Sequence, residues 1–303
     1  MILLNKFIAT VLPFFPRFLV RPFAKPYVAG ESLTEAIEKV KILNQQGYVV
    51  TMDILGEHVS DKTEAVAVKD SYLELLQTIK LAEITGTVSF KLTHLGLELD
   101  QELALKNTME IVRTARDLAI PVTIDMENSP YTDITIEIYQ QARAEFNKVG
   151  LVLQAYLFRS VDDIKVLDST DFRVRICKGI YRESPEIAIQ DRIEINDSFT
   201  SMTHSLLKGE GFAEIATHDR GLLDDLESWI EQNSIPKDRF EFQVLHGVPM
   251  GKRLERLLEK GYAVRIYVPF GNAWFDYSVR RLKENPNMAG YIISNLFKRW
   301  VSN

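Results

Sequence analysis

From Tyr48 onward, short runs rich in β-branched residues alternate with longer stretches whose apolar residues recur at helical spacing. The strand-like runs are YVVTMDIL, TVSFKLTHL, IPVTIDME, GLVLQAYLF, FRVRICKGI, FAEIATHD, RFEFQVLH and AVRIYVPFG. The helical stretches between them include Thr63–Glu83, Gln101–Leu118, Thr132–Phe146, Leu222–Gln232 and Gly251–Glu259. No low-complexity linker and no break in composition separates these units.

This alternation predicts an α/β protein with a parallel sheet. Eight strand–helix units in about 240 residues match the number and length of a (β/α)8 TIM-type barrel. A doubly wound open sheet is the main alternative, but no GxGxxG turn follows the first strand. We therefore predict a barrel with C-terminal helices over residues 48–303. An N-terminal helical segment, residues 1–47, is expected to pack on it.

The first part of that segment is largely apolar, but Pro13, Pro16, Arg17 and Arg21 interrupt it. No run approaches the roughly 20 apolar residues of a membrane-spanning helix. We interpret residues 1–30 as short helical pieces that pack on the barrel or lie against a bilayer surface. A cleaved secretory signal is the less favoured alternative.

The composition is that of an ordinary globular protein, with 46% apolar and 26% charged residues in a chain of 303. The net charge of −6 argues against nucleic acid as a partner, because such binding needs a basic face. The single cysteine, Cys177, excludes an intramolecular disulfide framework and suits a reducing compartment. We expect a cytoplasmic protein.

Polar residues stand at the ends of almost all the predicted strands. They are Lys91, Asp125, Glu127, Gln154, Lys178, His218, Asp219, His246 and Tyr267. Each such group costs free energy to bury unless it is paired, so a purely structural barrel gains nothing from collecting them. Active sites of this fold lie at the carboxyl ends of the strands. The sequence therefore predicts a site built by this ring of residues.

The helix predicted over Ala273–Asn285 carries an arginine pair directly after the eighth strand. Tyr277, Arg280, Arg281 and Glu284 lie three or four residues apart and share one side. Glu284 can brace either guanidinium, which leaves planar forks suited to a carboxylate. A solvated face with exposed ion pairs is the alternative that local sequence favours. The position of this helix beside the predicted site reverses that preference.

Two charged residues interrupt neighbouring apolar strands. Lys91 follows Phe90 in SFKLTHL, and Asp125 occupies TIDME on the next strand. A buried ammonium group needs a partner, and Asp125 is the natural one. The pair predicts a ligand-binding role, although an ion pair that merely fills the top of the barrel would give the same pattern.

The run FRVRICKGIY concentrates further chemistry on one strand. Arg173 and Arg175 are expected to share a face, and Lys178 is expected to point to the opposite one. Cys177 is most simply a small apolar filler. Gly179 allows a flat ring or a phosphate to approach the backbone.

No metal or nucleophile pattern appears in the sequence. HExxH, paired Cys/His spacing and a serine elbow are all absent. A lone histidine such as His218 is more often structural than catalytic. The residues alone therefore predict a site that binds a small carboxylate between cations and aromatic groups such as Tyr267. Its chemistry would come from a cofactor that composition does not identify.

The motifs VSFKLTHLGL, TIDMEN, LQAYL, RICKGIY, ATHD, FEFQVLHG, RIYVPFG and YSVRRLKENP occur in this order. Together they resemble proline dehydrogenase, a FAD-dependent family of proline catabolism, from about Thr51 to Pro286. The resemblance implies a distorted (β/α)8 barrel with its last helix over the barrel mouth. It also implies oxidation of L-proline to Δ1-pyrroline-5-carboxylate, with hydride passing from proline C5 to flavin N5 and electrons then to a quinone.

The resemblance also implies roles for individual residues. The catalytic positions are Lys91, Asp125, Tyr267, Arg280 and Arg281, and the substrate positions are Lys91, Leu245, Tyr267, Tyr277, Arg280 and Arg281. The FAD positions are Gln154, Arg175, Cys177, Lys178, Gly179, Thr217, His218 and Glu284. Arg175 would lie near flavin N5, and Glu284 would hold the last helix closed. Ile180 departs from the family pattern, in which alanine is common.

The implied partners are L-proline, a membrane quinone and a separate pyrroline-5-carboxylate dehydrogenase. The last follows because no aldehyde dehydrogenase module comes after the barrel, as expected of a monofunctional member. With residues 1–30 against the bilayer, the protein would lie in peripheral contact with the inner face of the membrane. The competing functions are a non-catalytic flavin barrel that binds a small carboxylate and a flavin barrel for a different substrate, such as a folate reductase.

Overall fold

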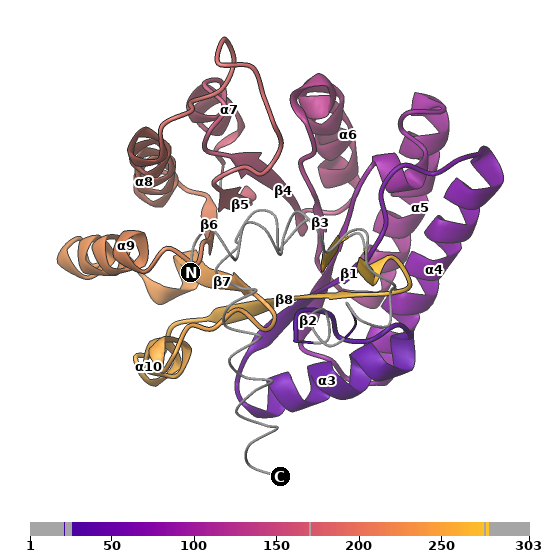
Figure 1. Cartoon of the computed structure of the whole chain (residues 1–303), viewed down its shortest axis with the longest axis horizontal. Helices are drawn as coiled ribbons and strands as arrows, with labels where there is room; N and C mark the ends of the chain where they lie inside the picture. The colour runs from indigo at the N-terminus through magenta and orange to yellow at the C-terminus, as the bar shows by residue number, and fades with distance from the viewer. Residues whose placement is uncertain (1–20, 22–25, 170, 276, 279–303) are drawn as a thin grey trace.

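The computed structural model describes Arg21 and residues 26–169, 171–275 and 277–278. Its parallel strands form one closed barrel in the order β1 to β8, which confirms the predicted fold (Figure 1). The strands are β1 (Val49–Ile54), β2 (Gly86–Phe90), β3 (Val122–Ile124), β4 (Val149–Gln154), β5 (Arg173–Cys177), β6 (Phe212–Ala216), β7 (Phe240–Leu245) and β8 (Val264–Phe270). Pairing of β8 with β1, with Thr51 opposite Tyr267, closes the barrel.

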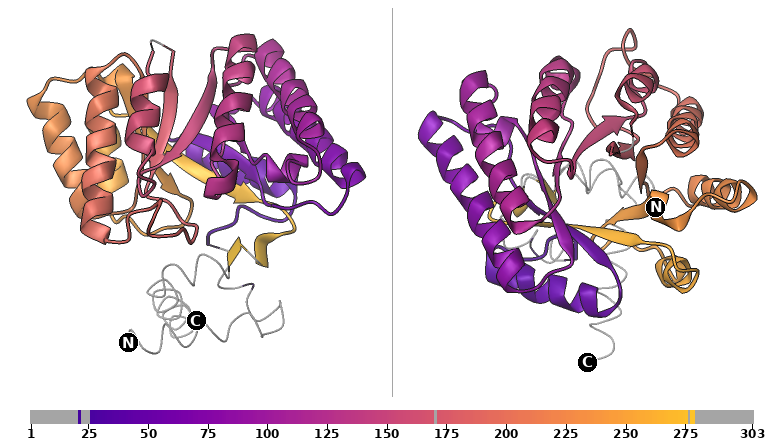
Figure 2. Two further views of the ribbon diagram at one scale, coloured as in Figure 1. Left: turned by 90° about the horizontal axis from the view of Figure 1, so that it is seen from above. Right: turned by 180° about the vertical axis from the view of Figure 1, so that it is seen from behind.

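Helices surround the barrel and run alongside the strands (Figures 1 and 2). They are α3 (Leu33–Gln45), α4 (Lys62–Leu81), α5 (Gln101–Leu118), α6 (Thr132–Glu145), α7 (Ser160–Leu167), α8 (Arg192–Lys208), α9 (Arg220–Gln232) and α10 (Arg253–Glu259). Short 3-10 turns, η2 (Thr93–Leu95), η3 (Ser129–Tyr131) and η4 (Lys237–Arg239), lie in the connections. Because α3 precedes β1 and packs on both β1 and β8, it covers the seam where the barrel closes.

Several predicted features lie outside the described residues. Arg280, Arg281 and Glu284 are among them, as is most of the predicted helix Ala273–Asn285. Residues 1–20 and 22–25 of the N-terminal segment are the others. None of the helices described above combines the length and the apolar character needed to cross a bilayer.

Aspartate side chains fix where several helices begin. Asp61, Asp100, Asp191 and Asp219 precede α4, α5, α8 and α9, and each accepts hydrogen bonds from backbone N–H groups of the first helical turn. These N–H groups have no partner within the helix, so each cap stabilises the turn by about 1 kcal/mol. The cap at α9 matters for function, because Asp219 also lines the central cavity.

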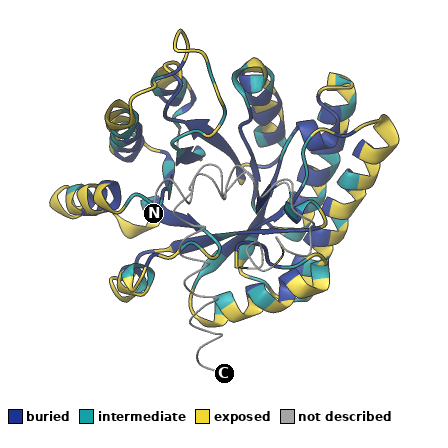
Figure 3. Cartoon of the chain, viewed as in Figure 1, coloured by how far each residue is buried: buried dark blue, intermediate teal, exposed yellow. Residues whose placement is uncertain are grey.

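Apolar and polar residues alternate along the strands. On β1 and β2, Val50, Met52, Val88 and Phe90 are fully buried in the apolar cluster that also contains the inner faces of the helices. Figure 3 shows the buried strands at the centre and the exposed outer faces of the helices. The polar residues at the alternate positions therefore point into the barrel, where one strand reaches another across the interior.

The interior contacts form a compensated charge network in the lower half of the barrel. We call Glu214, Glu241, Gln243 and Arg265 the barrel floor; all four are buried. Arg265 donates to both carboxylate oxygens of Glu241, and Gln243 Nε2 donates to Glu214 and Glu241 at 2.7 Å each. Burial alone would raise the pKa of Glu241 and lower that of Arg265, but their mutual attraction reverses both shifts.

Candidate active site

A cavity of about 530 Å³ opens at the carboxyl ends of the strands, and every strand of the barrel contributes to its wall or to the loops above it. This volume lies in the usual range for small-molecule and cofactor sites. The predicted residues that line it are Lys91, Asp125, Gln154, Arg175, Cys177, Lys178, Gly179, Thr217, His218, Leu245, Tyr267 and Tyr277. The structure thus brings together all the described residues to which the family resemblance assigns a role.

A lysine between two carboxylates forms one side of the cavity. Lys91 Nζ lies 3.1 Å from Asp53 Oδ2 and 3.2 Å from Asp125 Oδ2. The pair predicted between Lys91 and Asp125 is therefore present, and Asp53 is a second partner that the sequence analysis did not single out. The Lys91 side chain is 14% exposed, so it remains accessible from the cavity while its charge is compensated.

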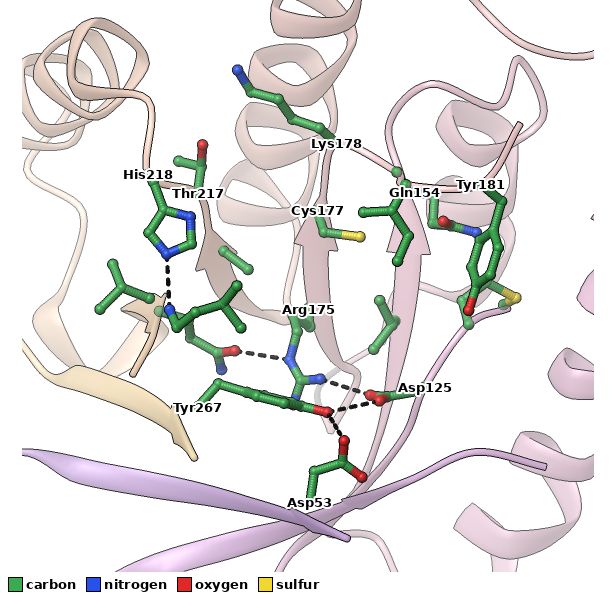
Figure 4. Close-up of a pocket in the computed structure, with 18 of the residues that line it drawn as sticks. Asp53, Asp125, Gln154, Arg175, Cys177, Lys178, Tyr181, Thr217, His218 and Tyr267 are labelled. Carbon is green, nitrogen blue, oxygen red and sulfur yellow. Dashed lines mark hydrogen bonds and ion pairs between the residues drawn. The ribbon is translucent and has the colours of Figure 1, made fainter. Parts of the chain in front are cut away.

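Tyr267 joins the same cluster. Its hydroxyl lies 2.8 Å from Asp53 Oδ2 and 3.0 Å from Asp125 Oδ2, so its single proton is shared between two acceptors (Figure 4). Its ring lies 5.1 Å from the guanidinium carbon of Arg175, within the range of a cation–π contact. Burial and the two carboxylates raise the pKa of the Tyr267 hydroxyl well above its ordinary value.

The protonation states in this cluster are set by mutual compensation. Burial alone would lower the pKa of Lys91, but Asp53, Tyr267 and Asp125 hold it well above the ordinary value, so the lysine stays charged. Burial would raise the pKa of Asp125, but Lys91 and Arg175 outweigh it and the pKa is lowered. Burial and the neighbouring Asp125 leave Asp53 with a raised pKa. The site therefore presents a permanent cation beside one firmly ionised carboxylate.

Arg175 reaches across the interior from β5. Its Nη1 lies 2.8 Å from Asp125 Oδ1, and its Nε donates to Gln243 Oε1 at 2.8 Å. Its Nη2 is buried and has no hydrogen-bond partner among the described residues, although Arg175 lines the cavity. A buried donor left unpaired costs about 1–3 kcal/mol. An acceptor on a bound group would remove that cost.

The opposite wall comes from β5, β6 and β7. Lys178 Nζ lies 2.7 Å from Asp219 Oδ2. Burial would raise the pKa of Asp219, but Lys178 and the Leu222 N–H lower it to about 2. His218 Nε2 accepts the backbone N–H of Leu245 at 2.9 Å, so the neutral ring carries its proton on Nδ1. Figure 4 shows Lys178, Thr217 and His218 on this wall, with Arg175, Asp125 and Tyr267 below them.

Three expectations about this ring of residues were wrong. Glu127 and His246 do not line the cavity, and the Glu127 carboxylate instead accepts hydrogen bonds from the backbone N–H and hydroxyl of Thr93. Lys178 does not face away from Arg175, because both line the cavity. The common reason is that these positions lie beyond the last residue of their strands, where the alternation of side chains no longer applies.

Gly179 is needed for a structural reason that the sequence analysis did not give. Its φ of +103° lies in the region that favours glycine, and a Cβ atom there would lie 2.1 Å from Cδ1 of Tyr156. The backbone at Gly179 therefore packs on the Tyr156 ring. This contact holds the start of the β5–α8 connection close to β4.

The sequence analysis missed Asp53 and Gln243, which also line the cavity. The signal for Asp53 was available, since it is an acidic residue near the end of an apolar strand, as Asp125 is. Gln243 could have been found from FEFQVL, in which polar residues alternate with apolar ones on a strand. What the sequence could not show is that its amide would meet Arg175.

Two buried histidines make the stability of the barrel depend on pH. Burial lowers the pKa of both His94 and His246 to about 4, against 6.5 in the unfolded chain. The stability of the neutral rings is thus fully present above pH 6.5 and is lost as the pH falls towards 4. As the pH falls from 8 to 5, each histidine should lower the free energy of unfolding by about 2 kcal/mol.

Urea unfolding at several pH values measures this loss. The free energy of unfolding of a His94→Gln/His246→Gln variant should depend less on pH than that of the wild type.

Comparison with known proteins gives a consistent result. Residues 36–292 match the model of the family described as proline dehydrogenase. Proline dehydrogenase 1 of Bacillus subtilis subsp. natto is 34% identical over 290 residues, covering 96% of each chain. Proline dehydrogenase of Deinococcus radiodurans is 32% identical over 280 residues, covering 91% of this chain and 90% of the relative.

A solved structure is also similar. Proline utilization A from Bdellovibrio bacteriovorus, inactivated by N-propargylglycine, superimposes on this chain with a TM-score of 0.81 at 26% identity. That match covers 89% of this chain and 33% of the other.

Proposed function

This chain belongs to the proline dehydrogenase family and oxidises proline, and we propose that it passes hydride from proline C5 to N5 of a bound FAD. The observation that carries the proposal is the buried cluster of Lys91, Arg175, Asp125 and Tyr267 on one side of the cavity. It offers a fixed positive charge to a small anion. The same cavity has room for a flat cofactor against the opposite wall.

The residues that line the cavity fit a flavin. The unpaired Nη2 of Arg175 is a buried donor that needs an acceptor, and flavin rings present several. Gln154, Arg175, Lys178, Thr217 and His218 would hold the cofactor, with Cys177 and Gly179 beside it. When bound, FAD supplies the two-electron acceptor that the side chains of the site lack.

The proline carboxylate would bind where the cations gather. Lys91 provides one charge, and we propose that Arg280 and Arg281 complete the clamp, with Glu284 bracing them. Tyr267 would pack on the pyrrolidine ring, and Leu245 and Tyr277 would close the apolar side, since both line the cavity. Asp125 would act by holding Lys91 and Arg175 in place. Orientation by several fixed groups is a large source of rate.

The bond changes set a requirement on the substrate amine. The C5–H bond breaks with both electrons leaving as hydride, and the nitrogen lone pair forms the C=N bond of pyrroline-5-carboxylate. The protonated amine carries two N–H protons and has no free lone pair, so it must lose one of these protons before the hydride leaves. We expect kcat/KM to rise with pH between neutral and mildly alkaline conditions, as measured by initial rates with an artificial electron acceptor. A flat profile over that range would contradict this requirement.

The decisive test of the function is an anaerobic titration with L-proline. The purified protein, reconstituted with FAD, should be yellow, and proline should bleach the flavin absorbance in proportion to the protein present. A colourless protein that no flavin reconstitutes would contradict the proposal. Flavin that stays oxidised with proline would favour the alternative of a non-catalytic or different-substrate barrel.

Two partners follow from the same proposal. We propose that the electrons pass on to a membrane quinone, with residues 1–30 making peripheral contact with the inner face of the membrane. The product would need oxidation by a separate pyrroline-5-carboxylate dehydrogenase. Relatives such as the bifunctional protein PutA of Escherichia coli support a linked second step. The region that matches this chain makes up only 23% of that protein.

A further inference from the structure

The connection between β5 and α8, residues 178–191, forms part of the cavity wall on the side assigned to the cofactor. Lys178, Gly179, Ile180 and Tyr181 all line the cavity. The connection contains neither a helix nor a strand, apart from one isolated bridge between Ala188 and Leu157. Something other than regular secondary structure must therefore hold it over the cavity.

Backbone hydrogen bonds fix the two ends of this connection. The Tyr156 N–H donates to the Lys178 carbonyl at 3.0 Å, and the Ile189 N–H donates to the Tyr156 carbonyl at 2.7 Å. The Phe158 N–H also donates to the Ile187 carbonyl at 3.1 Å. These bonds attach both ends to the turn after β4. In the middle, the Ser184 carbonyl accepts the N–H groups of Ile187 and Ala188, which are bonds within the connection itself.

Glu183 ties that middle segment to a different strand unit. Its carboxylate accepts the Ser129 backbone N–H and the Ser129 hydroxyl, each at 2.7 Å. Ser129 begins η3 in the connection after β3, four residues beyond Asp125. Both partners are half-buried, and bonds to an ionised carboxylate are about twice as strong as neutral ones. The link therefore joins the connection after β5 to the connection after β3, on either side of β4.

We propose that Glu183 is a positioning residue whose bonds to Ser129 hold residues 180–186 against the cavity and so retain the flavin. The inference rests on the proposed FAD binding, and it concerns the release of the cofactor. Without the link, residues 180–186 are held less tightly beside the cavity, while the attached ends of the connection stay in place. The flavin then escapes faster although its polar contacts are unchanged.

The test is the rate of FAD release from the reconstituted protein, followed as free-flavin fluorescence after dilution. Glu183→Ala should raise this rate about fivefold or more, as expected for the loss of two charge-assisted bonds. Glu186→Ala is the matched control. It removes an exposed carboxylate from the same connection. Among the described residues, Glu186 forms a hydrogen bond through its backbone N–H and not through its carboxylate, so the rate should not change.

A double-variant cycle shows whether the effect runs through Ser129. Ser129→Ala alone should raise the rate by a smaller factor, because the backbone N–H bond remains, and it should add nothing in the Glu183→Ala background. The thermal midpoint of the flavin-free variants reports any general loss of structure. Release at the wild-type rate from Glu183→Ala, or equal effects of Ser129→Ala in both backgrounds, would overturn the inference. A wild type that holds no FAD would instead overturn the proposed function on which it rests.

Discussion

Replacement of Lys91 by methionine is expected to lower kcat/KM for proline by about 30-fold to several thousand-fold, which corresponds to about 2–5 kcal/mol. Lys91 Nζ lies 3.1 and 3.2 Å from two buried carboxylates, and its raised pKa keeps it charged at every working pH. Without it, a carboxylate substrate would face Asp53 and Asp125 with no neighbouring lysine to balance them. The carboxylates of the substrate and of Asp125 would then repel each other in a poorly solvated cavity.

The measurement is steady-state kinetics with proline and an artificial acceptor, normalised to bound flavin. Lys62→Met is the matched control, since Lys62 also pairs with an aspartate, Asp100, but is 63% exposed on the surface. An exposed pair of this kind contributes about 1 kcal/mol or less, so the control should keep wild-type kinetics. If Lys91→Met kept kcat/KM within about threefold of wild type, Lys91 would not bind the substrate carboxylate.

The fold was predictable because its signals are local and repeated. Each repeating unit is a short apolar run followed by a helical pattern. A closed barrel is the arrangement that buries eight such runs. Helix ends were less predictable. The predicted helix at Leu222 begins at Arg220, because Asp219 caps it, and the one at Gly251 begins at Arg253. A cap depends on loop geometry that a periodic pattern does not contain.

The sequence predicted which residues form the site better than it predicted which of them contact one another. Lys91 and Asp125 could be paired in advance because an unpaired charge in an apolar strand is costly and the two strands are neighbours. The partners of Arg175 could not be predicted, because they lie on β2, directly after β3 and on β7, and its own strand touches none of these strands. Which interior side chains meet depends on the tilt and register of the closed barrel.

The same dependence on geometry explains the errors at the strand ends. Glu127 and His246 follow the last residues of β3 and β7, and there the chain turns into loops that carry their side chains away from the cavity. Asp53 lies inside β1 and obeys the strand alternation, so it faces the interior. A prediction restricted to positions within each strand would have kept Asp53 and left out the other two. It would also have lost Lys91 and Asp125, which follow the last residues of β2 and β3 and do line the cavity.

Replacement of Arg265 by methionine is expected to lower the free energy of unfolding by about 3–5 kcal/mol. Arg265 donates to both oxygens of Glu241 and also to the Val50 carbonyl and the Thr87 hydroxyl, all in the barrel floor and its surroundings. Its loss would leave the Glu241 carboxylate buried with only an amide partner, Gln243. Urea unfolding of the flavin-free protein measures the change.

The double variant Arg265→Met/Glu241→Leu separates the net worth of the ion pair from the cost of breaking it. Removing both charges also removes both desolvation penalties, so the double variant should recover most of the stability that the single variant loses.

The activity of the double variant should stay close to that of the wild type. Gln243 keeps its bond to Glu214 at 2.7 Å, and Arg175 keeps its bonds to Gln243 and Asp125, so the cation that faces the cavity stays in place. We therefore expect kcat/KM of the folded double variant to stay within about threefold of wild type. A much larger loss would show that the barrel floor positions Arg175, and that stability and catalysis are not separate layers of this barrel.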